Sequence, residues 1–305
     1  MDLRTVSVIG LGALGTMYAH HLHQRMPGVR IVADEERIRR YRSTGIYCNG
    51  KPCDFHYIAP GQAGPADLLI FAVKQGGLEG AIETARDQVG GNTIVLSLLN
   101  GISSETVIGQ AYGEAHMLLC VAQGMDAVMA DGRLTYHNMG LIVFGDREKG
   151  VVSDMARSVE DLFKRMEVPH IVDTDMQKRQ WGKFMLNVGV NQAIAVYGNS
   201  YADVQKQSAV RDVMIAAMEE VRSLSEAEGV GLSAQDMAYW LGILPGLSPA
   251  GKPSMRQDVE AKRPSEVELF SGTVLALAMK HGMDTPVNRE LYKRITEMER
   301  GYTLT

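Results

Sequence analysis

Cysteine is scarce in this sequence, with only Cys48, Cys53 and Cys120 among 305 residues. So few cysteines at such irregular spacing argue against a disulfide framework and against a cysteine-based zinc site. Cys48 and Cys53 flank an Asn49-Gly50 turn and could face each other across a hairpin, but buried thiols are the simpler interpretation. Cysteine usage of this kind is typical of the cytoplasm.

Long hydrophobic runs and blocks of one charge sign are also missing. No apolar run reaches the roughly 20 residues that cross a bilayer, and the first residues predict a strand instead of a secretory leader. The net charge is −5, and the basic segment 37–40 fits a solvated helix face. We therefore expect neither a membrane nor a nucleic acid as partner.

The remaining composition, 45 % hydrophobic and 22 % charged, is ordinary for a globular protein. A length of 305 residues predicts two domains. Strand and helix patterns alternate up to Asp173 and only helical patterns follow. We expect an α/β fold in which an N-terminal Rossmann-type, doubly wound sheet (1–173) is followed by an all-helical C-terminal domain (174–305). A substrate would sit in the cleft between them.

Near-continuous apolar segments predict buried parallel strands. Strands are expected at 5–9, 29–33, 67–73, 93–98, 117–121, 133–137, 141–144 and 170–172, with hairpins at 46–58 and around Asp131-Gly132. Helices are expected after Gly12 and at 35–43, 78–89, 104–112 and 153–166. In the second half, helices are expected at 176–197, 204–228, 234–244, 264–281 and 287–300, and a loop at 245–253.

The first predicted strand ends in a glycine-rich turn that fits a dinucleotide. The GxGxxG residues are Gly10, Leu11, Gly12, Ala13, Leu14 and Gly15. In this strand–turn–helix context, the glycines allow a tight turn, close approach to a pyrophosphate and close packing of the helix on the strand. The helix N-terminus offers unpaired N–H groups to the phosphates. The alternative is an ordinary tight turn that contains glycines by chance.

Polar side chains form one stripe on the predicted helix 176–197. Lys183, Asn187 and Asn191 are spaced i, i+4, i+8, so each step advances only about 40° around the helix. Apolar neighbours surround them, and polar groups in such surroundings need polar partners. A bound polar molecule would provide these partners. Alternatively, the stripe is a surface lysine and two asparagines that bond to nearby loops.

Other candidate residues lie next to loops and strand ends. Ser254 closes the proline-rich loop, and Glu266 lies in the first turn of a predicted helix, where an acidic residue also simply complements the helix dipole. Lys74 and Asn100 follow two predicted parallel strands. Ligands bind at that edge of an open α/β sheet, although both residues could also belong to plain turns.

Taken together, these pieces resemble the ketopantoate reductases (2-dehydropantoate 2-reductases) of the 6-phosphogluconate-dehydrogenase-like superfamily. The resemblance covers nearly the whole chain. It rests on the glycine turn, Val73-Lys74, Asn100-Gly101, the Lys183 stripe, the block from Ser254 to Glu266, and the segment from Gly282 to Tyr292. It implies reduction of a 2-keto acid by a nicotinamide hydride, on the route to pantothenate and coenzyme A.

The resemblance also implies roles for individual residues. Lys183 would be the proton donor, aided by apolar surroundings that lower the pKa of a lysine. Glu266 would orient the substrate and lie near the cofactor. Asn187, Asn191 and Ser254 match substrate positions, while Lys74 and Asn100 match cofactor contacts and Asn100 also lies by the substrate. No metal is implied, and a homodimer is an open alternative.

Two features depart from the family. The family commonly grips the 2′-phosphate of NADPH with an arginine after the second strand, whereas this chain has Asp34, 19 residues after Gly15. An acidic residue there binds the ribose of NAD and repels a 2′-phosphate. NADP(H) is thus the expectation from the resemblance, and NAD(H) the serious alternative. Arg37, Arg39 and Arg40 are close enough in sequence to bind a 2′-phosphate in place of the missing arginine. Arg256, beside Ser254, would favour a second acidic group on the substrate or else point to solvent.

Three competing functions remain. The nearest is a paralogous NAD(P)H-dependent reductase of another branched or acidic 2-keto acid. A nicotinamide-binding sensor without turnover would lack the proton donor, yet Lys183 is present. If the helical half served only for dimerisation, the helix would carry an apolar stripe that excludes water. The sequence has Lys183, Asn187 and Asn191 at these positions instead.

Overall fold

The computed structural model describes residues 1–302. The chain divides into two compact units, Met1–Gln177 and a second that begins at Lys178. The division lies a few residues beyond the boundary expected at 173, inside the first turn of a long helix.

The first unit is built on a parallel sheet with the order β5-β2-β1-β6-β7. Its strands are β1 (Val6–Ile9), β2 (Arg30–Val32), β5 (His56–Ile58), β6 (Leu68–Phe71) and β7 (Ile94–Ser97). All neighbouring pairs run parallel, with Val8 opposite Ile31 on one side and Ile70 on the other. In chain order this is the 3-2-1-4-5 arrangement of a Rossmann fold, which confirms the fold class expected from the sequence.

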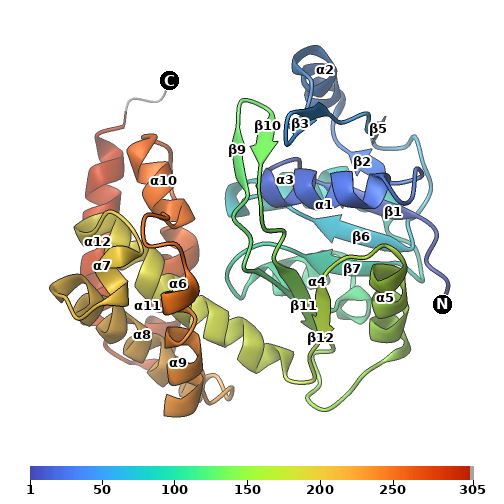
Figure 1. The fold of residues 1–305 in the computed structure, drawn as a ribbon. Coiled ribbons are helices and arrows are strands. Elements are labelled where there is room, and N and C mark those ends of the chain that lie inside the picture. The colour runs from blue at the N-terminus through green and yellow to red at the C-terminus, as the bar shows by residue number, and fades with distance from the viewer. Residues whose placement is uncertain (303–305) are drawn as a thin grey trace. The chain divides into compact units, whose positions relative to one another are not determined.

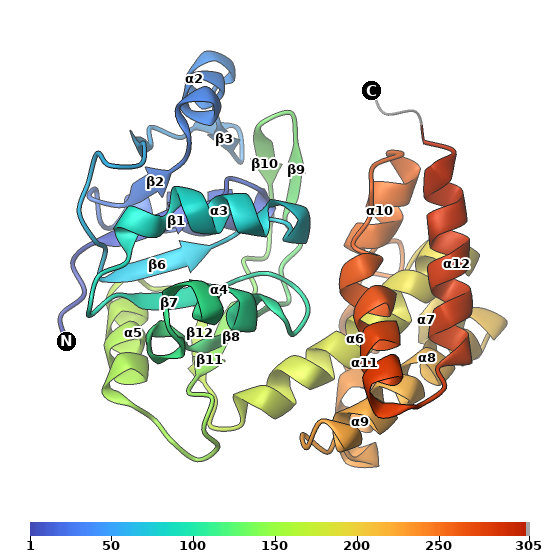
Figure 2. The same ribbon diagram turned by 180° about the vertical axis from the view of Figure 1, so that it is seen from behind.

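Helices cover both faces of this sheet. Leu68 and Ile70 pack on one face among residues of α1 (Ala13–His23) and α5 (Asp154–Arg165). Leu69 and Phe71 pack on the opposite face among residues of α3 (Leu78–Thr84) and α4 (Ser104–Tyr112). The helices α1 and α5 face the viewer in Figure 1, and α3 and α4 do so in Figure 2. Burial on both faces explains why the strands are almost continuously apolar.

Two smaller sheets complete the first unit. One has the order β4-β3-β10-β9, and the other has the order β12-β11-β8. Their strands are β3 (Tyr47–Cys48), β4 (Lys51–Pro52), β8 (Leu119–Gln123), β9 (Val128–Ala130), β10 (Arg133–Thr135), β11 (Leu141–Gly145) and β12 (His170–Val172). The remaining helices of the unit are α2 (Glu35–Thr44) and the short 3₁₀ turns η1 (Gln75–Gly77), η2 (Arg86–Gln88) and η3 (Glu114–His116).

One expected hairpin is shorter than predicted. The Asn49-Gly50 turn does join an antiparallel pair, β3 with β4. The following segment 56–58 instead becomes β5, which pairs in parallel with β2 at the edge of the main sheet. Local turn chemistry identified the hairpin, but pairing with a distant strand decides where the next strand goes. None of the three cysteines forms a disulfide in the described part of the chain.

The second unit is helical throughout its described residues. It contains α6 (Met176–Tyr197), α7 (Ala202–Gln205), α8 (Ala209–Ala227), α9 (Ala234–Leu241), η4 (Leu244–Gly246), α10 (Ser254–Glu260), the π-helical turn η5 (Glu268–Gly272), α11 (Thr273–His281) and α12 (Pro286–Arg300). Helix α6 was predicted with these same limits. The predicted helix 204–228 is broken between α7 and α8, and α10 was not predicted.

The described residues contain no helix that is both long enough and apolar enough to cross a membrane. Within the same residues, no group of histidine, cysteine, aspartate and glutamate side chains is arranged to hold a metal ion.

Candidate dinucleotide and substrate sites

Two glycines of the turn after β1 are required by the protein's own packing. Gly10 has a φ of +97°, and a Cβ there would lie 2.6 Å from the carbonyl oxygen of Ala72. A Cβ on Gly15 would lie 1.9 Å from the carbonyl oxygen of Gly10. These contacts hold α1 tightly against the ends of β1 and β6.

Gly12 differs from the other two glycines because nothing in the protein crowds it. It is exposed, precedes α1 as the N-cap residue and has an ordinary φ of −76°. A Cβ there would meet only the Ala72 carbonyl oxygen, at the ordinary distance of 3.8 Å. The open space lies where the N–H groups of the first turn of α1 point, which fits a pyrophosphate approaching the backbone.

We therefore expect Gly12→Ala to fold with an unchanged melting temperature but to bind a dinucleotide several-fold more weakly. The added methyl group would displace the phosphates without touching protein atoms. Calorimetric titration with the cofactor, beside a thermal melt, measures both effects. Unchanged affinity would show that the phosphates do not approach this glycine.

Three further candidate residues follow other strands of the same sheet. Asp34 comes after β2, Lys74 after β6, and Asn100 after β7. Because these strands run parallel with β1, their carboxyl ends share one edge with the glycine turn. Lys74 is exposed, whereas Asp34 and Asn100 are partly buried. This edge, where the strand order reverses between β1 and β6, is where α/β sheets bind dinucleotides.

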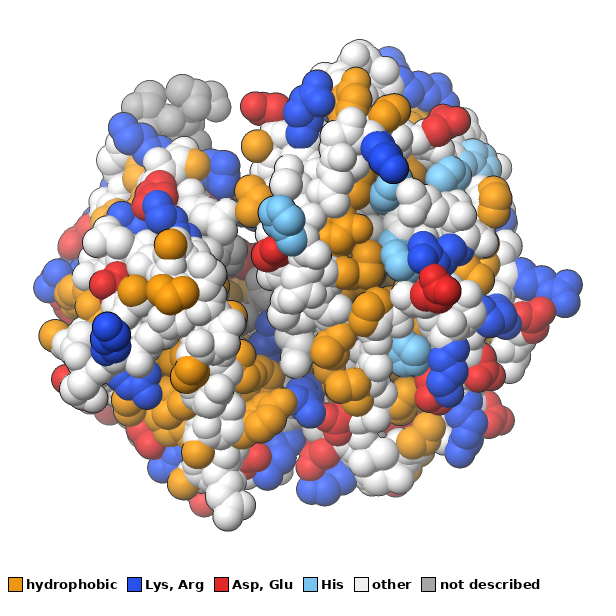
Figure 3. All heavy atoms as spheres, in the orientation of Figure 1, with side chains coloured by type: hydrophobic (Ala, Val, Ile, Leu, Met, Phe, Trp, Pro, Cys, Tyr) orange, Lys and Arg blue, Asp and Glu red, His pale blue; other side chains and the backbone are white. Residues whose placement is uncertain are grey.

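Asp34 caps the N-terminus of α2 and also pairs with an arginine. One carboxylate oxygen accepts the backbone N–H of Arg37 at 2.7 Å, and the other lies 3.1 Å from Nη1 of Arg37. Both side chains are nearly half exposed. Figure 3 shows charged side chains of both signs on the part of the first unit where Figure 1 labels α2. An anion that needs Arg37 would therefore have to compete with Asp34.

The Lys183 stripe lies on α6 in the second unit. Lys183 and Asn187 are partly buried, and Asn191 is only 7 % exposed. Phe184, Val188 and Val190 of the same helix are buried. The stripe therefore has buried apolar neighbours along α6. Lys183 and Asn187 are open to solvent in part, while Asn191 is nearly covered.

Residues that the sequence analysis overlooked hold α6 in place. A Cβ on Gly182 would lie 1.9 Å from Nε1 of Trp240 in α9, and one on Gly189 would lie 2.5 Å from Cγ of Met218 in α8. Arg179 lies over the ring of Trp240, with 5.9 Å between its Cζ and the ring centre. The sequence did carry a signal for this packing. Glycine is unfavourable inside a helix, so Gly182 and Gly189 within the predicted helix indicate that another element packs closely there.

Glu266 does not lie in the first turn of a helix, contrary to the expectation. It is a partly buried bend residue that precedes η5. Its carbonyl oxygen accepts the N–H of Phe270 at 3.1 Å, and the N–H of Gly272 reaches back to Val267 at 3.0 Å. Glu266 therefore lies at the N-terminal edge of this helix, where the helix dipole still favours a carboxylate, and it comes just before a π-helical turn, a feature that is frequent at functional sites.

Ser254 begins α10 and is exposed. At the other end of α10, the Asp258 carboxylate lies 3.0 Å from Nε of Arg263. This ion pair closes α10 just before the segment that carries Glu266. The block from Ser254 to Glu266 therefore consists of one short helix, α10, and a following segment whose start is fixed by this ion pair.

Arg256 is used within the second unit. Its Nε lies 3.1 Å from Glu260, and its other nitrogens donate to the Ala195 carbonyl oxygen (3.4 Å) and to Asn199 (3.2 Å). The bond from Lys252, followed by that from Arg256, lowers the pKa of Glu260. These contacts tie α10 to the end of α6, so the guanidinium does not simply point to solvent and its role is explained without a second acidic group on the substrate.

We expect Arg256→Gln to cost about 1 kcal/mol of unfolding free energy, because it removes an ion pair and two hydrogen bonds that are partly exposed. The ratio of kcat/KM for monocarboxylic and dicarboxylic 2-keto acids should not change. Denaturant unfolding measures the change in stability, and kinetics with one monocarboxylic and one dicarboxylic 2-keto acid measure the ratio. Lys252→Gln is the control, because it also removes a partner of Glu260. A loss confined to dicarboxylic substrates would contradict it.

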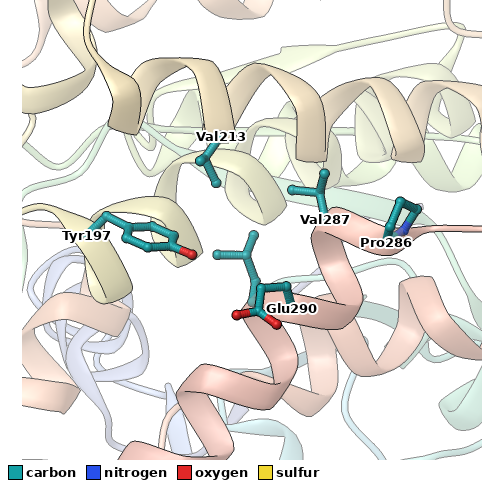
Figure 4. Close-up of a pocket in the computed structure, with 6 residues that line it drawn as sticks. Tyr197, Val213, Pro286, Val287 and Glu290 are labelled. Carbon is teal, nitrogen blue, oxygen red and sulfur yellow. The ribbon is translucent and has the colours of Figure 1, made fainter.

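A cavity of about 270 Å³ lies elsewhere in the second unit (Figure 4). Its lining residues are Tyr197, Val213, Pro286, Val287, Glu290 and Leu291. The lining is mostly apolar, and none of the predicted site residues belongs to it.

The glycine turn, the strand order and the residues along the carboxyl edge define a dinucleotide-binding protein of the Rossmann class. Residues 6–149 match the family described as Ketopantoate reductase PanE/ApbA, and residues 175–299 match its C-terminal part. The chain belongs to the ketopantoate reductase family and is an oxidoreductase of the kind that uses a nicotinamide cofactor.

Individual relatives agree along the whole chain. A 2-dehydropantoate 2-reductase from Vibrio cholerae is 24 % identical, covering 98 % of this chain and 99 % of the relative. The structure of a D-mandelate dehydrogenase with NADH and anilino(oxo)acetate has a TM-score of 0.87 at 19 % identity, covering 98 % and 99 % of the two chains. A dimeric ketopantoate reductase from Staphylococcus aureus has a TM-score of 0.80 at 20 % identity, covering 98 % and 100 %. At these identities the structures are similar in fold.

Proposed function

We propose that this protein is a 2-dehydropantoate 2-reductase that reduces ketopantoate to pantoate for pantothenate and coenzyme A synthesis. The observation that carries the proposal is the stripe of Lys183, Asn187 and Asn191 on α6, next to buried apolar residues of the same helix, in a chain whose residues 6–149 and 175–299 match this family. Three polar groups in a row suit a small ligand with a carboxylate, a keto oxygen and a hydroxyl group.

The residues divide the work as follows. The turn from Gly10 to Gly15 binds the dinucleotide phosphates: Gly12 lets them approach the backbone, while the close packing of Gly10 and Gly15 fixes the turn. Lys74 and Asn100 lie at the neighbouring strand ends. When bound, the reduced nicotinamide supplies a hydride to the keto carbon. Lys183 polarises the carbonyl and gives its proton to the oxygen, so that one C–H and one O–H bond replace the carbonyl π bond. Asn187, Asn191 and Ser254 bind the rest of the substrate, Glu266 orients it, and Asn100 lies beside it.

The family resemblance implies NADPH, yet we propose that this chain prefers NADH. Asp34 stands where a ribose hydroxyl would be bound, and it holds Arg37, the nearest cation along α2, in an ion pair. A 2′-phosphate there would meet a carboxylate whose charge is only partly offset. We also propose a homodimer, supported by the dimeric enzyme from Staphylococcus aureus.

A second candidate is an NADH-dependent reductase of another branched or acidic 2-keto acid. Asp34 favours this alternative over a typical family member, as does the similarity to a D-mandelate dehydrogenase that holds NADH. The 2-keto acid chemistry and the role of Lys183 would be the same. Only the groups that contact the substrate side chain would differ.

The test mixes the purified protein with ketopantoate and follows nicotinamide absorbance with NADH and NADPH in parallel. Fast oxidation with ketopantoate would establish the reaction, and the ratio of kcat/KM values would give the cofactor preference. A folded protein that binds cofactor but leaves ketopantoate unchanged would overturn the proposal, and a panel of 2-keto acids would then test the second candidate.

A further inference from the structure

Helix α12 contacts the chain on both sides of Glu266. Three hydrogen bonds make these contacts: Ser265 N–H to Glu299 Oε1 (2.9 Å), Tyr292 O–H to Glu268 Oε1 (2.5 Å) and Ser271 O–H to Asn288 Oδ1 (3.1 Å). The first partner precedes Glu266 by one residue, and the other two lie in η5. The segment that carries this carboxylate is therefore held at three points by one helix.

The three side chains of α12 share one face of the helix. Asn288, Tyr292 and Glu299 are separated by four and seven residues, which places them within an arc of about 40°. Lys293 and Glu297, which lie outside this arc, are exposed. The phenol of Tyr292 is protonated at neutral pH and donates to Glu268, and this bond is the main cause that raises the pKa of Tyr292.

Asn288 also connects this face to α6 and α8. Its Oδ1 accepts Nε2 of Gln192 in α6 at 3.4 Å, and its Nδ2 donates to Glu220 in α8 at 2.7 Å. Gln192, Ser271 and Asn288 are completely buried. Gln192 directly follows Asn191, the last residue of the Lys183 stripe. Nδ2 and Oδ1 of Asn288 are both hydrogen-bonded in this buried cluster, although Oε1 of Gln192 has no partner in the described residues, and such buried bonds favour one arrangement of the helices.

The hydrogen bonds from α12 are important because η5 is a π-helical turn. In η5 one extra residue is accommodated in the helical turn, so the chain before it points in a different direction from the one an α-helix would give. The bonds from Ser271 and Glu268 to α12 hold this turn, and the bond from Ser265 holds the residue before Glu266. An unsupported segment could exchange between π- and α-helical turns, which would move Glu266.

We propose that Asn288, Tyr292 and Glu299 are positioning residues that fix Glu266 relative to the Lys183 helix. This inference rests on the proposed function, because it takes Glu266 as the carboxylate that orients the substrate. The face acts through Glu266 and contacts neither substrate nor cofactor.

The experiment compares two double variants of the full chain. Tyr292→Phe/Glu299→Ala removes two of the three bonds and leaves buried Asn288 intact, while Lys293→Ala/Glu297→Ala is the matched control on the exposed side of α12. We expect the first variant to lower kcat with the 2-keto acid about tenfold or more, since small misplacements of a site residue have effects of this size. Backbone amides of residues 265–272 should exchange hydrogen for deuterium faster, with cofactor affinity and melting temperature close to those of the control.

The single variant Glu299→Gln keeps a carbonyl oxygen that can accept the Ser265 N–H. We expect this variant to have near-normal kcat and near-normal amide exchange. Wild-type kcat in the first variant, or an equal loss in the control, would overturn the inference. Unchanged amide exchange in 265–272 would also overturn it, whichever substrate the enzyme uses. Failure of the proposed function looks different, because the wild-type protein itself would then not reduce ketopantoate.

Discussion

Lys183→Ala should lower kcat for reduction of the 2-keto acid by about 10²- to 10⁴-fold, the usual contribution of a general acid. Without the ammonium, the oxygen that gains negative charge during hydride addition has neither a cation nor a proton beside it. Cofactor affinity should be nearly unchanged, because the glycine turn lies in the other unit of the chain. Steady-state kinetics and a cofactor titration separate the two effects.

The same helix provides a control for this variant. Lys178 lies in the first turn of α6 and forms an ion pair with Asp236 at 2.9 Å. Lys178→Ala therefore removes a lysine and a charge from α6 without touching the stripe, and it should keep near-normal kcat. Full activity of Lys183→Ala would rule out the assigned role, and an equal loss in both variants would point to damage to α6 itself.

Much of the nucleotide-binding unit could be predicted because its signals are local. The strands around Val8 and Ile70 are apolar on both faces, and the glycines at 10 and 15 stand where a Cβ cannot fit. The place of the segment 56–58 could not be predicted in this way. It pairs with β2 in the main sheet instead of with its hairpin neighbour, and such pairing depends on contacts that are distant in sequence.

The helical unit shows the same limit at its candidate site. The Lys183 stripe follows from a simple period of four residues in one long helix. The π-helical turn after Glu266 and the seven-residue helix α10 carry no comparable period. Their conformations depend on partners such as Asn288 and Arg263. Glu266 could therefore be proposed from the family resemblance alone, whereas the contacts of its neighbours with α12 needed the structure.

Asp34→Asn should shift the cofactor preference towards NADPH, raising the ratio of kcat/KM for NADPH to that for NADH by roughly tenfold or more. Two like charges a few ångströms apart near a protein surface repel by a few kcal/mol before screening, and 1.4 kcal/mol is already tenfold. The carboxamide oxygen can still accept the Arg37 N–H and cap α2. Arg37 loses its carboxylate partner and becomes available to a 2′-phosphate.

Asp34→Asn changes only the charge of this residue, whereas Asp34→Arg would also remove the helix cap and cost about 1 kcal/mol of stability. Glu35→Gln is the matched control, since Glu35 is the next residue, equally acidic, and forms an exposed ion pair with Arg39. If both variants shift the ratio equally, the general charge of the region sets the preference. If neither shifts it, Asp34 serves only to cap α2, and the family expectation of NADPH has no local obstacle in this chain.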